Sequence, residues 1–392
     1  MVTKPHKGAK IAIQPRIRKG AFFDAAWRHG CRKFSVYNRT YISSTFSDPT
    51  DEYWNVTKNV AIWPVMGERQ IEIRGKDAAK FVQFLTSRDM SKCAVNQCKS
   101  ALITDQSGGI VCDPIILKLA HDRFWLSTSD CDLELWAKGV AVNAPFKDVA
   151  ISDANVSVIQ IQGPKSPNLV NDMFGEDVLD LKYYWHKTVI FQGNGLQISR
   201  TGWSGEFGYE LYLEDHAQGD ALFDALLDTG KPYGVAPGAV NQTRRIESGI
   251  LSWGVDMGID ENPYQVGLGR LVELENDNHF IGRAALEKIK DQQLEKTLVG
   301  LLIEGPPLEA NESPWNLYSN GKNVGKLTSL SYSPRLEKNI ALGLVSKDFS
   351  EVGTELSVTT WDGERNLYVS GLPFLPKLQN GDARSLLQAS KR

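Results

Sequence analysis

The sequence predicts an α+β fold with a separate β-rich unit at its C-terminal end. Strand patterns and helix patterns alternate from residue 21 to about residue 291, and beyond a polar stretch at 291–296 nearly every pattern is strand or turn. The chain has 392 residues, of which 42% are hydrophobic and 23% charged, so it can bury a large core. A chain of this length is expected to form two or three domains.

Changes of composition predict where these domains begin and end. Residues 1–20 are rich in Lys and Arg and predict an irregular basic arm. Residues 21–291 are predicted to form the main domain, with two subdomains. Residues 292–378 are predicted to form the β-rich domain, and residues 379–392 a loose tail.

The elements of the main domain follow from hydrophobic periodicity. Residues 69–74 alternate polar and apolar side chains, as a half-buried strand does. Residues 76–85 place four apolar side chains on one helical face, with Asp77 near the positive end of the helix dipole. Two short strands around Gln106–Gly109 predict a hairpin, because Gly108 and Gly109 supply positive φ angles. Further strands are expected at 115–119, 122–128, 156–162 and within 188–213, and further helices after 129–130 and at 220–227.

Charge and motif content argue against several classes of function. Lys plus Arg is 44 and Asp plus Glu is 47, a net charge of −3, which provides no basic field for nucleic acid. No apolar run reaches the ~18 residues of a membrane span, and no apolar region follows the basic N-terminus as in a secretory signal. Five Cys without a CxxC pair predict a reduced, cytoplasmic location, and six scattered His predict no metal site. Phosphate-loop, HExxH and GxSxG motifs are not found.

Three segments contain acidic, basic or aromatic side chains in arrangements that favour a ligand-binding role over a purely structural one. Residues 104–114 form a tight hairpin that returns the acid Asp113 to the body of the protein. Residues 199–212 combine three Gly with aromatic and acidic side chains, and put Glu210 and Tyr212 on one face of a strand. A carboxylate there can accept two N–H bonds from an aminopyrimidine edge. The third segment, 243–249, contains Arg245. The sequence is equally compatible with roles that involve no ligand: Asp113 can cap a turn, and Arg245 can be a solvent-exposed charge.

The order of these motifs resembles the folate-dependent methyltransferases of the glycine-cleavage T-protein superfamily. The resemblance spans roughly residues 20–375. It rests on residues 62–63, 68–70, 108–113, 162–164, 200–210, 245–249, 281–286, 325–334 and 340–343.

The resemblance implies a fold and a cofactor. The fold would be a three-lobed disc of mixed α/β subdomains around a central channel, with a small C-terminal domain like a β-barrel. Tetrahydrofolate would lie in the channel as co-substrate, without a metal. Asp113 would be the catalytic residue beside N5 and N10. The implied folate-binding residues are Glu210, Tyr212, Trp203, Arg245 and Ser100.

Within the superfamily the chain resembles the dimethylsulfoniopropionate demethylases. This resemblance rests on residues 34–38, 87–89, 96–98, 113–114, 162–165, 246–252 and 262–264. It implies transfer of a methyl group from a small onium compound to N5 of tetrahydrofolate, by a monomer or homodimer without nucleic-acid or membrane partners. The implied substrate-binding residues are Tyr37, Asn38, Arg39, Tyr184 and Trp185.

Departures from the family patterns leave alternatives open. Ser100 stands where relatives usually have Tyr, Cys112 where the T-protein has an acid, and Arg39 where the demethylase has His. Pro64 replaces an Asp and Arg270 an aromatic residue. These departures bear on the substrate more than on the fold. The alternatives are an aminomethyltransferase that uses a lipoyl-bound carrier, a methyltransferase acting on a quaternary amine or methyl ether, and a folate-binding accessory protein.

Overall fold

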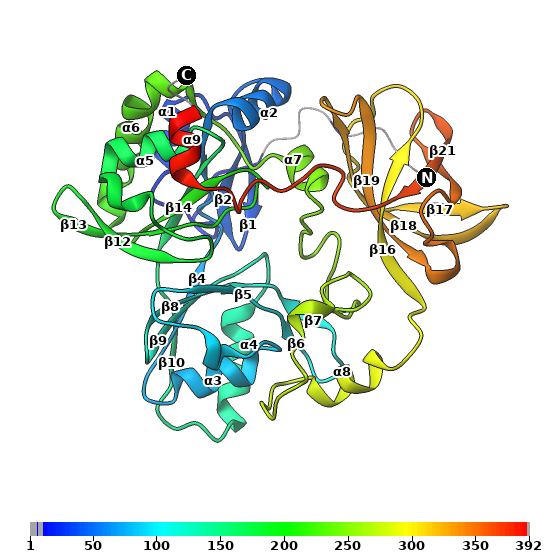
Figure 1. Cartoon of the computed structure of the whole chain (residues 1–392), viewed down its shortest axis with the longest axis horizontal. Coiled ribbons are helices and arrows are strands. Elements are labelled where there is room, and N and C mark those ends of the chain that lie inside the picture. The colour runs from blue at the N-terminus through cyan, green and yellow to red at the C-terminus, as the bar shows by residue number, and fades with distance from the viewer. Residues whose placement is uncertain (1–5, 7–10, 390–392) are drawn as a thin grey trace.

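Three lobes surround the middle of the molecule (Figure 1). The structure is a computed structural model that describes residue 6 and residues 11–389. Two lobes of mixed helix and sheet come from the N-terminal part of the chain, and a closed β-barrel forms the third. The predicted α+β class, the three lobes and the C-terminal barrel are thus confirmed. Among the described residues, no helix is long and apolar enough to cross a membrane.

The first lobe is built on a six-stranded sheet of order β12-β13-β14-β11-β3-β15. Its core is formed where apolar faces of helices meet the sheet; for example, Leu222, Phe223 and Leu226 of the predicted helix are buried. A two-stranded ribbon, β1–β2, lies beside it. The strands are β1 Lys33–Tyr37, β2 Thr40–Thr45, β3 Val60–Pro64, β11 Ser157–Gln162, β12 His186–Phe191, β13 Asn194–Ser199, β14 Gly208–Leu213 and β15 Val235–Pro237, and the helices are α1 Phe23–Arg28, α2 Pro49–Lys58, α5 Ser166–Phe174 and α6 Gly219–Gly230.

The second lobe contains a five-stranded sheet of order β10-β4-β9-β8-β5. The predicted helical face is confirmed, because Ala78, Phe81, Val82 and Leu85 are all buried. The predicted strand at 69–74 exists, but its half-buried character is wrong: Glu72 is buried too, and accepts hydrogen bonds from Arg123 at 2.5 Å and Trp125 at 3.1 Å. The elements are β4 Gln70–Arg74, β5 Cys98–Ser100, β8 Ile115–Ala120, β9 Arg123–Ser127, β10 Ala150–Asp153, α3 Ala78–Leu85 and α4 Leu133–Asn143, with the hairpin β6 Ile103–Thr104 and β7 Ile110–Cys112.

The third lobe is a closed barrel of order β16-β19-β18-β17-β20-β21. The segment that links it to the first lobe contains α7 Gln242–Glu247 and α8 Arg283–Lys290, which lie between the lobes (Figure 1). The barrel strands are β16 Lys296–Ile303, β17 Trp315–Ser319, β18 Lys322–Ser333, β19 Lys338–Ser346, β20 Glu355–Thr360 and β21 Gly363–Ser370. Short 3-10 turns occur at η1 Met90–Lys92, η2 Glu176–Val178, η3 His216–Gln218, η4 Lys231–Tyr233, η5 Gly269–Leu271 and η6 Lys347–Phe349.

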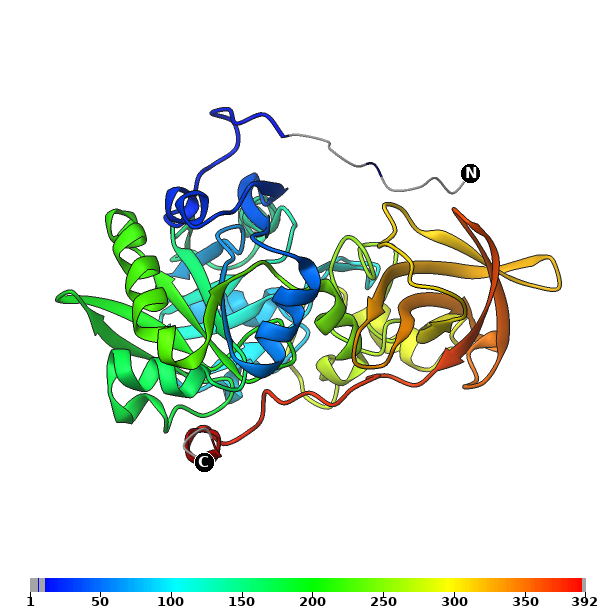
Figure 2. The same cartoon turned by 90° about the horizontal axis from the view of Figure 1, so that it is seen from above.

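The C-terminal segment returns from the barrel to the first lobe (Figure 2). It ends in α9 Ala383–Ala389, and Arg384 of this helix pairs with Asp180 at 2.9 Å. Ala383 is buried, and buried Arg200 donates to the carbonyl oxygens of Gln379 and Gly381. The predicted loose tail is therefore wrong for residues 379–389, because apolar side chains of the helix pack on the first lobe.

The predicted N-terminal arm is described in part. Residues 11–20 contain no helix or strand beyond a single bridge between Arg18 and Thr40. Residues 1–5 and 7–10 of the predicted arm lie outside the described residues.

Candidate active site

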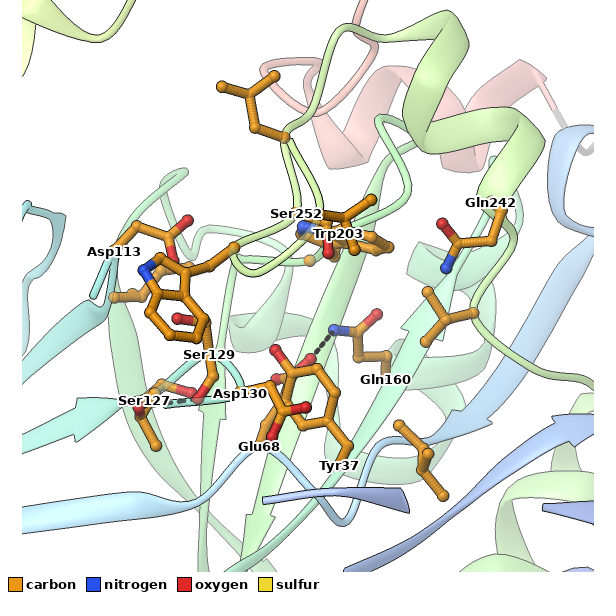
Figure 3. Close-up of a pocket in the computed structure, with 18 of the residues that line it drawn as sticks. Tyr37, Glu68, Asp113, Ser127, Ser129, Asp130, Gln160, Trp203, Gln242 and Ser252 are labelled. Carbon is orange, nitrogen blue, oxygen red and sulfur yellow. Dashed lines mark hydrogen bonds between the residues drawn. The ribbon is translucent and has the colours of Figure 1, made fainter. Parts of the chain in front are cut away.

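A cavity of about 430 Å³ lies where the two N-terminal lobes and the segment 240–255 meet (Figure 3). No barrel residue is among those that line it. Four carboxyl side chains and three aromatic rings face it, whereas no Lys, Arg or His of the described residues does. The carboxyl groups are those of Glu68, Asp113, Asp130 and Glu210, and the rings those of Tyr37, Trp203 and Trp253.

Asp113 reaches the cavity because the hairpin β6–β7 turns sharply. Asp105 accepts backbone N–H bonds from Ser107 and Gly109 at 2.8 and 2.9 Å, and Gly108 takes a φ of 86°. The strand β7 then leads directly to Asp113, whose Oδ1 is buried without a hydrogen-bond partner among the described residues. Burial raises the pKa of this carboxyl to about 7, and a hydrogen bond from Ser129 opposes the rise. Asp113 can therefore exchange a proton near neutral pH.

Glu210 is held rigidly in the middle of the six-stranded sheet. Its carboxylate accepts hydrogen bonds from Gln160 Nε2 at 2.7 Å, Tyr212 Oη at 2.9 Å and Thr201 Oγ1. Burial raises the pKa of Glu210, and these hydrogen bonds oppose the rise. Glu210 and Tyr212 share one face, as predicted from their spacing. Tyr212, however, lies behind Glu210 and supports the carboxylate, since it is not a lining residue.

Glu68 is a lining carboxyl that was not among the predicted site residues. It lies in the turn between β3 and β4, and its Oε1 accepts a 3.3 Å hydrogen bond from Gln160, which also binds Glu210. Burial raises the pKa of Glu68 well above its ordinary value, and the charge of Glu210 adds to the rise. A single Glu in a turn is usually exposed, so periodicity gave no reason to select it. The motif 68–70, noticed in the resemblance, was the available signal.

Trp203 faces the cavity from the glycine-rich loop between β13 and β14. The loop needs glycine at Gly205, where φ is 74° and a Cβ would lie 1.9 Å from Ser248 Oγ. Arg245 lies behind Trp203, with its guanidinium 5.4 Å from the ring. Its side chain is buried and contacts Asp256 at 2.5 Å, so Arg245 supports the wall and does not line the cavity.

Of the predicted substrate residues in the first ribbon, only Tyr37 faces the cavity. Burial raises the pKa of its hydroxyl well above the ordinary value, with a further contribution from Glu68. Asn38 fixes the turn, because its Nδ2 donates to Gly67 O at 3.0 Å and Ser129 O at 2.8 Å. Arg39 is 72% exposed and pairs with Asp132 outside the cavity. The β1–β2 turn is tight, with positive φ angles at both Asn38 and Arg39. The side chains of these two residues therefore do not point into the cavity as that of Tyr37 does.

Tyr184, Trp185 and Ser100 form a group outside the lining of the cavity. Burial raises the pKa of Tyr184, and hydrogen bonds with Tyr183 and Ser100 oppose the rise. Trp185 bridges to Gln97 through its backbone. These residues join the two N-terminal lobes, because Tyr184 O accepts a 2.7 Å hydrogen bond from Cys98 N. The sequence could not show this, since the two segments are far apart in the chain.

The side chains of the cavity suit a flat ligand that carries N–H donors. Aromatic rings provide its walls, and oxygen acceptors with unused capacity, Asp113 Oδ1 and Gln160 Oε1, are buried without partners among the described residues. In the described part of the chain, no group of three or more His, Cys, Asp or Glu could hold a metal ion.

Comparisons with known proteins identify the family. The GCVT N-terminal domain family matches residues 16–276, and the glycine cleavage T-protein C-terminal barrel domain family matches residues 296–375. The dimethylsulfoniopropionate demethylase of Ruegeria pomeroyi is 34% identical over 92% of this chain and 98% of its own. An aminomethyltransferase of Alkaliphilus oremlandii is 31% identical over 87% of this chain and 93% of its own.

A solved structure supports the same fold. The crystal structure of the glycine cleavage system aminomethyltransferase T from Bartonella henselae superposes with a TM-score of 0.83, covering 92% of this chain and 99% of that chain at 21% identity. The predicted resemblance is thus confirmed, as is the prediction that the chain is an enzyme, since these relatives are transferases and a demethylase by name. With both of its domains matched, the chain belongs to the glycine cleavage T-protein family.

Proposed function

We propose that this protein transfers a methyl group from a small onium compound, first of all dimethylsulfoniopropionate, to N5 of tetrahydrofolate. The proposal rests mainly on Asp113, whose carboxyl has a pKa of about 7 and an Oδ1 without a hydrogen-bond partner among the described residues, in an acidic, aromatic cavity. The demethylase relative, which matches nearly the whole chain, supports the choice of donor.

The cavity fits the pterin ring of tetrahydrofolate. Glu210 is an anchored carboxylate of the kind that binds adjacent N–H groups of an aminopyrimidine edge. Trp203 and Tyr37 provide aromatic surfaces for a planar ring. When bound, tetrahydrofolate supplies a nucleophilic nitrogen, N5, that carries one hydrogen.

The residues of the cavity supply positioning and proton transfer. The methyl–sulfur bond breaks, the sulfide leaves as a neutral molecule with the bonding electrons, and a methyl–nitrogen bond forms. The nitrogen thereby loses its proton, which Asp113 accepts, as its pKa near neutrality allows. Orientation of the two reactants can supply roughly 7–11 kcal/mol of the barrier. The faces of Tyr37 and Trp253 attract the onium charge by about 2 kcal/mol when water is excluded.

The test is anaerobic incubation of the protein with tetrahydrofolate and one methyl donor at a time. The donors are dimethylsulfoniopropionate, glycine betaine, dimethylglycine and a methoxyaromatic acid, and 5-methyltetrahydrofolate is measured by chromatography. We expect product with the sulfonium, and a loss of at least about 100-fold in turnover for Asp113→Asn. If only another donor gives product, that donor would replace dimethylsulfoniopropionate as the proposed substrate. If no donor gives product, the proposal would be overturned.

An aminomethyltransferase activity is the second candidate. It is favoured by the named aminomethyltransferases that match 78–87% of the chain. The same assay with an aminomethylated lipoyl carrier protein separates the two, because this activity yields methylenetetrahydrofolate and ammonia only when the carrier is present.

A further inference from the structure

The carboxyl groups of the cavity differ in how far their hydrogen-bonding capacity is filled. Glu210 has three donors, from Gln160, Thr201 and Tyr212. Asp130 accepts a 2.7 Å hydrogen bond from the backbone N–H of Asn38. From the part of the chain that the structure describes, Glu68 accepts only one side-chain hydrogen bond, the long 3.3 Å contact with Gln160. Among the described residues, Glu68 has no ion pair with Lys, Arg or His.

The fold does not need the Glu68 side chain for its turn. The backbone N–H of Glu68 donates to Val65 O at 2.9 Å, and its carbonyl oxygen accepts from Gln70 Nε2 at 3.0 Å. These bonds use backbone atoms of Glu68 and do not involve its carboxyl group. The carboxyl group instead lies beside the ring of Tyr37 on one wall of the cavity (Figure 3).

This combination suits a cation that cannot donate hydrogen bonds. A sulfonium or quaternary ammonium centre has no N–H or O–H group, so aromatic faces and negative charge are the features that can recognise it. A neutral pterin ring can fill hydrogen-bond acceptors, but it brings no charge to balance a buried carboxylate. Because no Lys or Arg of the described residues lines the cavity, the cationic end of the donor is the end that these walls can recognise.

We propose that the Glu68 carboxylate pairs with the positive charge of the methyl donor, beside Tyr37, and selects onium compounds over uncharged molecules of the same shape. This inference rests on the proposed function, since it names how the same cavity distinguishes donors.

Pairing with a cation should also release a proton. Burial and Glu210 raise the pKa of Glu68, so a bound cation favours its ionised form. The titratable groups that line the cavity with Glu68 are Tyr37 on β1, Glu210 on β14, and Asp113 and Asp130 on the loops after β7 and β9. All of these groups are acidic, so within the described ranges no positively charged side chain lines the cavity to take the place of the donor's charge.

The deciding experiment compares two ligands of one shape. Dimethylsulfoniopropionate and its carbon isostere 4-methylpentanoate differ in the sulfonium charge, and their dissociation constants are measured by titration calorimetry. We expect wild type to prefer the sulfonium by at least about tenfold, and Glu68→Gln to lose most of this preference. Asp132→Asn, which removes an exposed carboxyl outside the cavity, serves as the matched control and should keep it.

Further measurements separate charge pairing from structural damage and from failure of the proposed function. Calorimetry in buffers of different ionisation enthalpy should show more proton release for wild type than for Glu68→Gln. Tetrahydrofolate affinity should change less than twofold, and Glu68→Asp should recover part of the sulfonium preference. An undiminished preference in Glu68→Gln would overturn the role of Glu68 even if the sulfonium is a methyl donor. If no onium compound is a donor for wild type, the proposed function itself fails.

Discussion

Asp113→Asn should make the ligand-free protein more stable while it lowers the proposed methyl-transfer turnover at least about 100-fold. In the folded protein burial raises the pKa of Asp113 from an ordinary value of 3.8 to about 7. Between these two pH values the folded state therefore holds a proton that the unfolded state has lost. Wild-type stability accordingly falls as pH rises through this window, and asparagine, which has no charge to bury, removes the loss.

The expected magnitude follows from the separation of the two pKa values. Each pH unit within the window is worth about 1.4 kcal/mol. The stability gained by Asp113→Asn should therefore be larger at pH 8 than at pH 5 by about 2.5 kcal/mol, as an upper value, because water entering the cavity would lessen it. Comparing the two pH values cancels any constant effect of exchanging carboxyl for amide.

The measurement is urea unfolding of wild type and Asp113→Asn at both pH values, without folate. Tryptophan fluorescence and circular dichroism are recorded together, because a chain of several lobes can unfold in steps. Asp132→Asn is the control and should show no such pH-dependent gain, since its carboxyl is 71% exposed. A gain for Asp113→Asn that is equal at pH 5 and pH 8 would refute the reasoning, because Asp113 would then be ionised in the folded state throughout.

Three further outcomes follow from the contacts of individual residues. Tyr212→Phe should weaken tetrahydrofolate binding about two- to tenfold in calorimetry, because Glu210 loses a 2.9 Å donor; an unchanged affinity would show that Glu210 does not hold the ligand. Arg200→Lys should lower the free energy of unfolding by about 1–3 kcal/mol, since Arg200 donates to three carbonyl oxygens and stacks 3.5 Å from the Phe207 ring centroid; unchanged urea unfolding would contradict this. Arg39→Ala should change the KM for the methyl donor less than twofold, and a larger rise in steady-state assays would restore Arg39 as a substrate contact.

The sequence was sufficient for features that depend on local pattern. The hairpin that delivers Asp113 follows from adjacent glycines between two short strands, and the shared face of Glu210 and Tyr212 follows from their spacing. Trp203 was expected at the site from the family resemblance, and the structure places it in a loop where glycines stand at positions that leave no room for a Cβ. Each of these signals lies within about a dozen residues.

Predictions that depended on packing between distant segments were less complete. The C-terminal helix could not be foreseen, because its binding site on the first lobe is formed by residues about 200 positions earlier, such as Asp180. Glu68 was overlooked because only the folded chain brings it near Glu210. Tyr212 and Arg245 were expected to contact folate, but they do not line the cavity and instead contact Glu210 and Trp203, which do. Spacing along the chain does not show which of two neighbouring side chains lines a cavity.

The barrel belongs to the site although none of its residues lines the cavity. Asp256 makes this connection: one carboxylate oxygen accepts from Arg245, behind Trp203, and from the backbone N–H of Ser252, a lining residue. The other accepts from Thr328 and Ser329 of β18, both at 2.6 Å. Because all of these groups are buried or nearly so, breaking the contact would leave charged atoms without partners, at a cost of several kcal/mol. The position of Trp203 is therefore coupled to the barrel through Arg245 and Asp256.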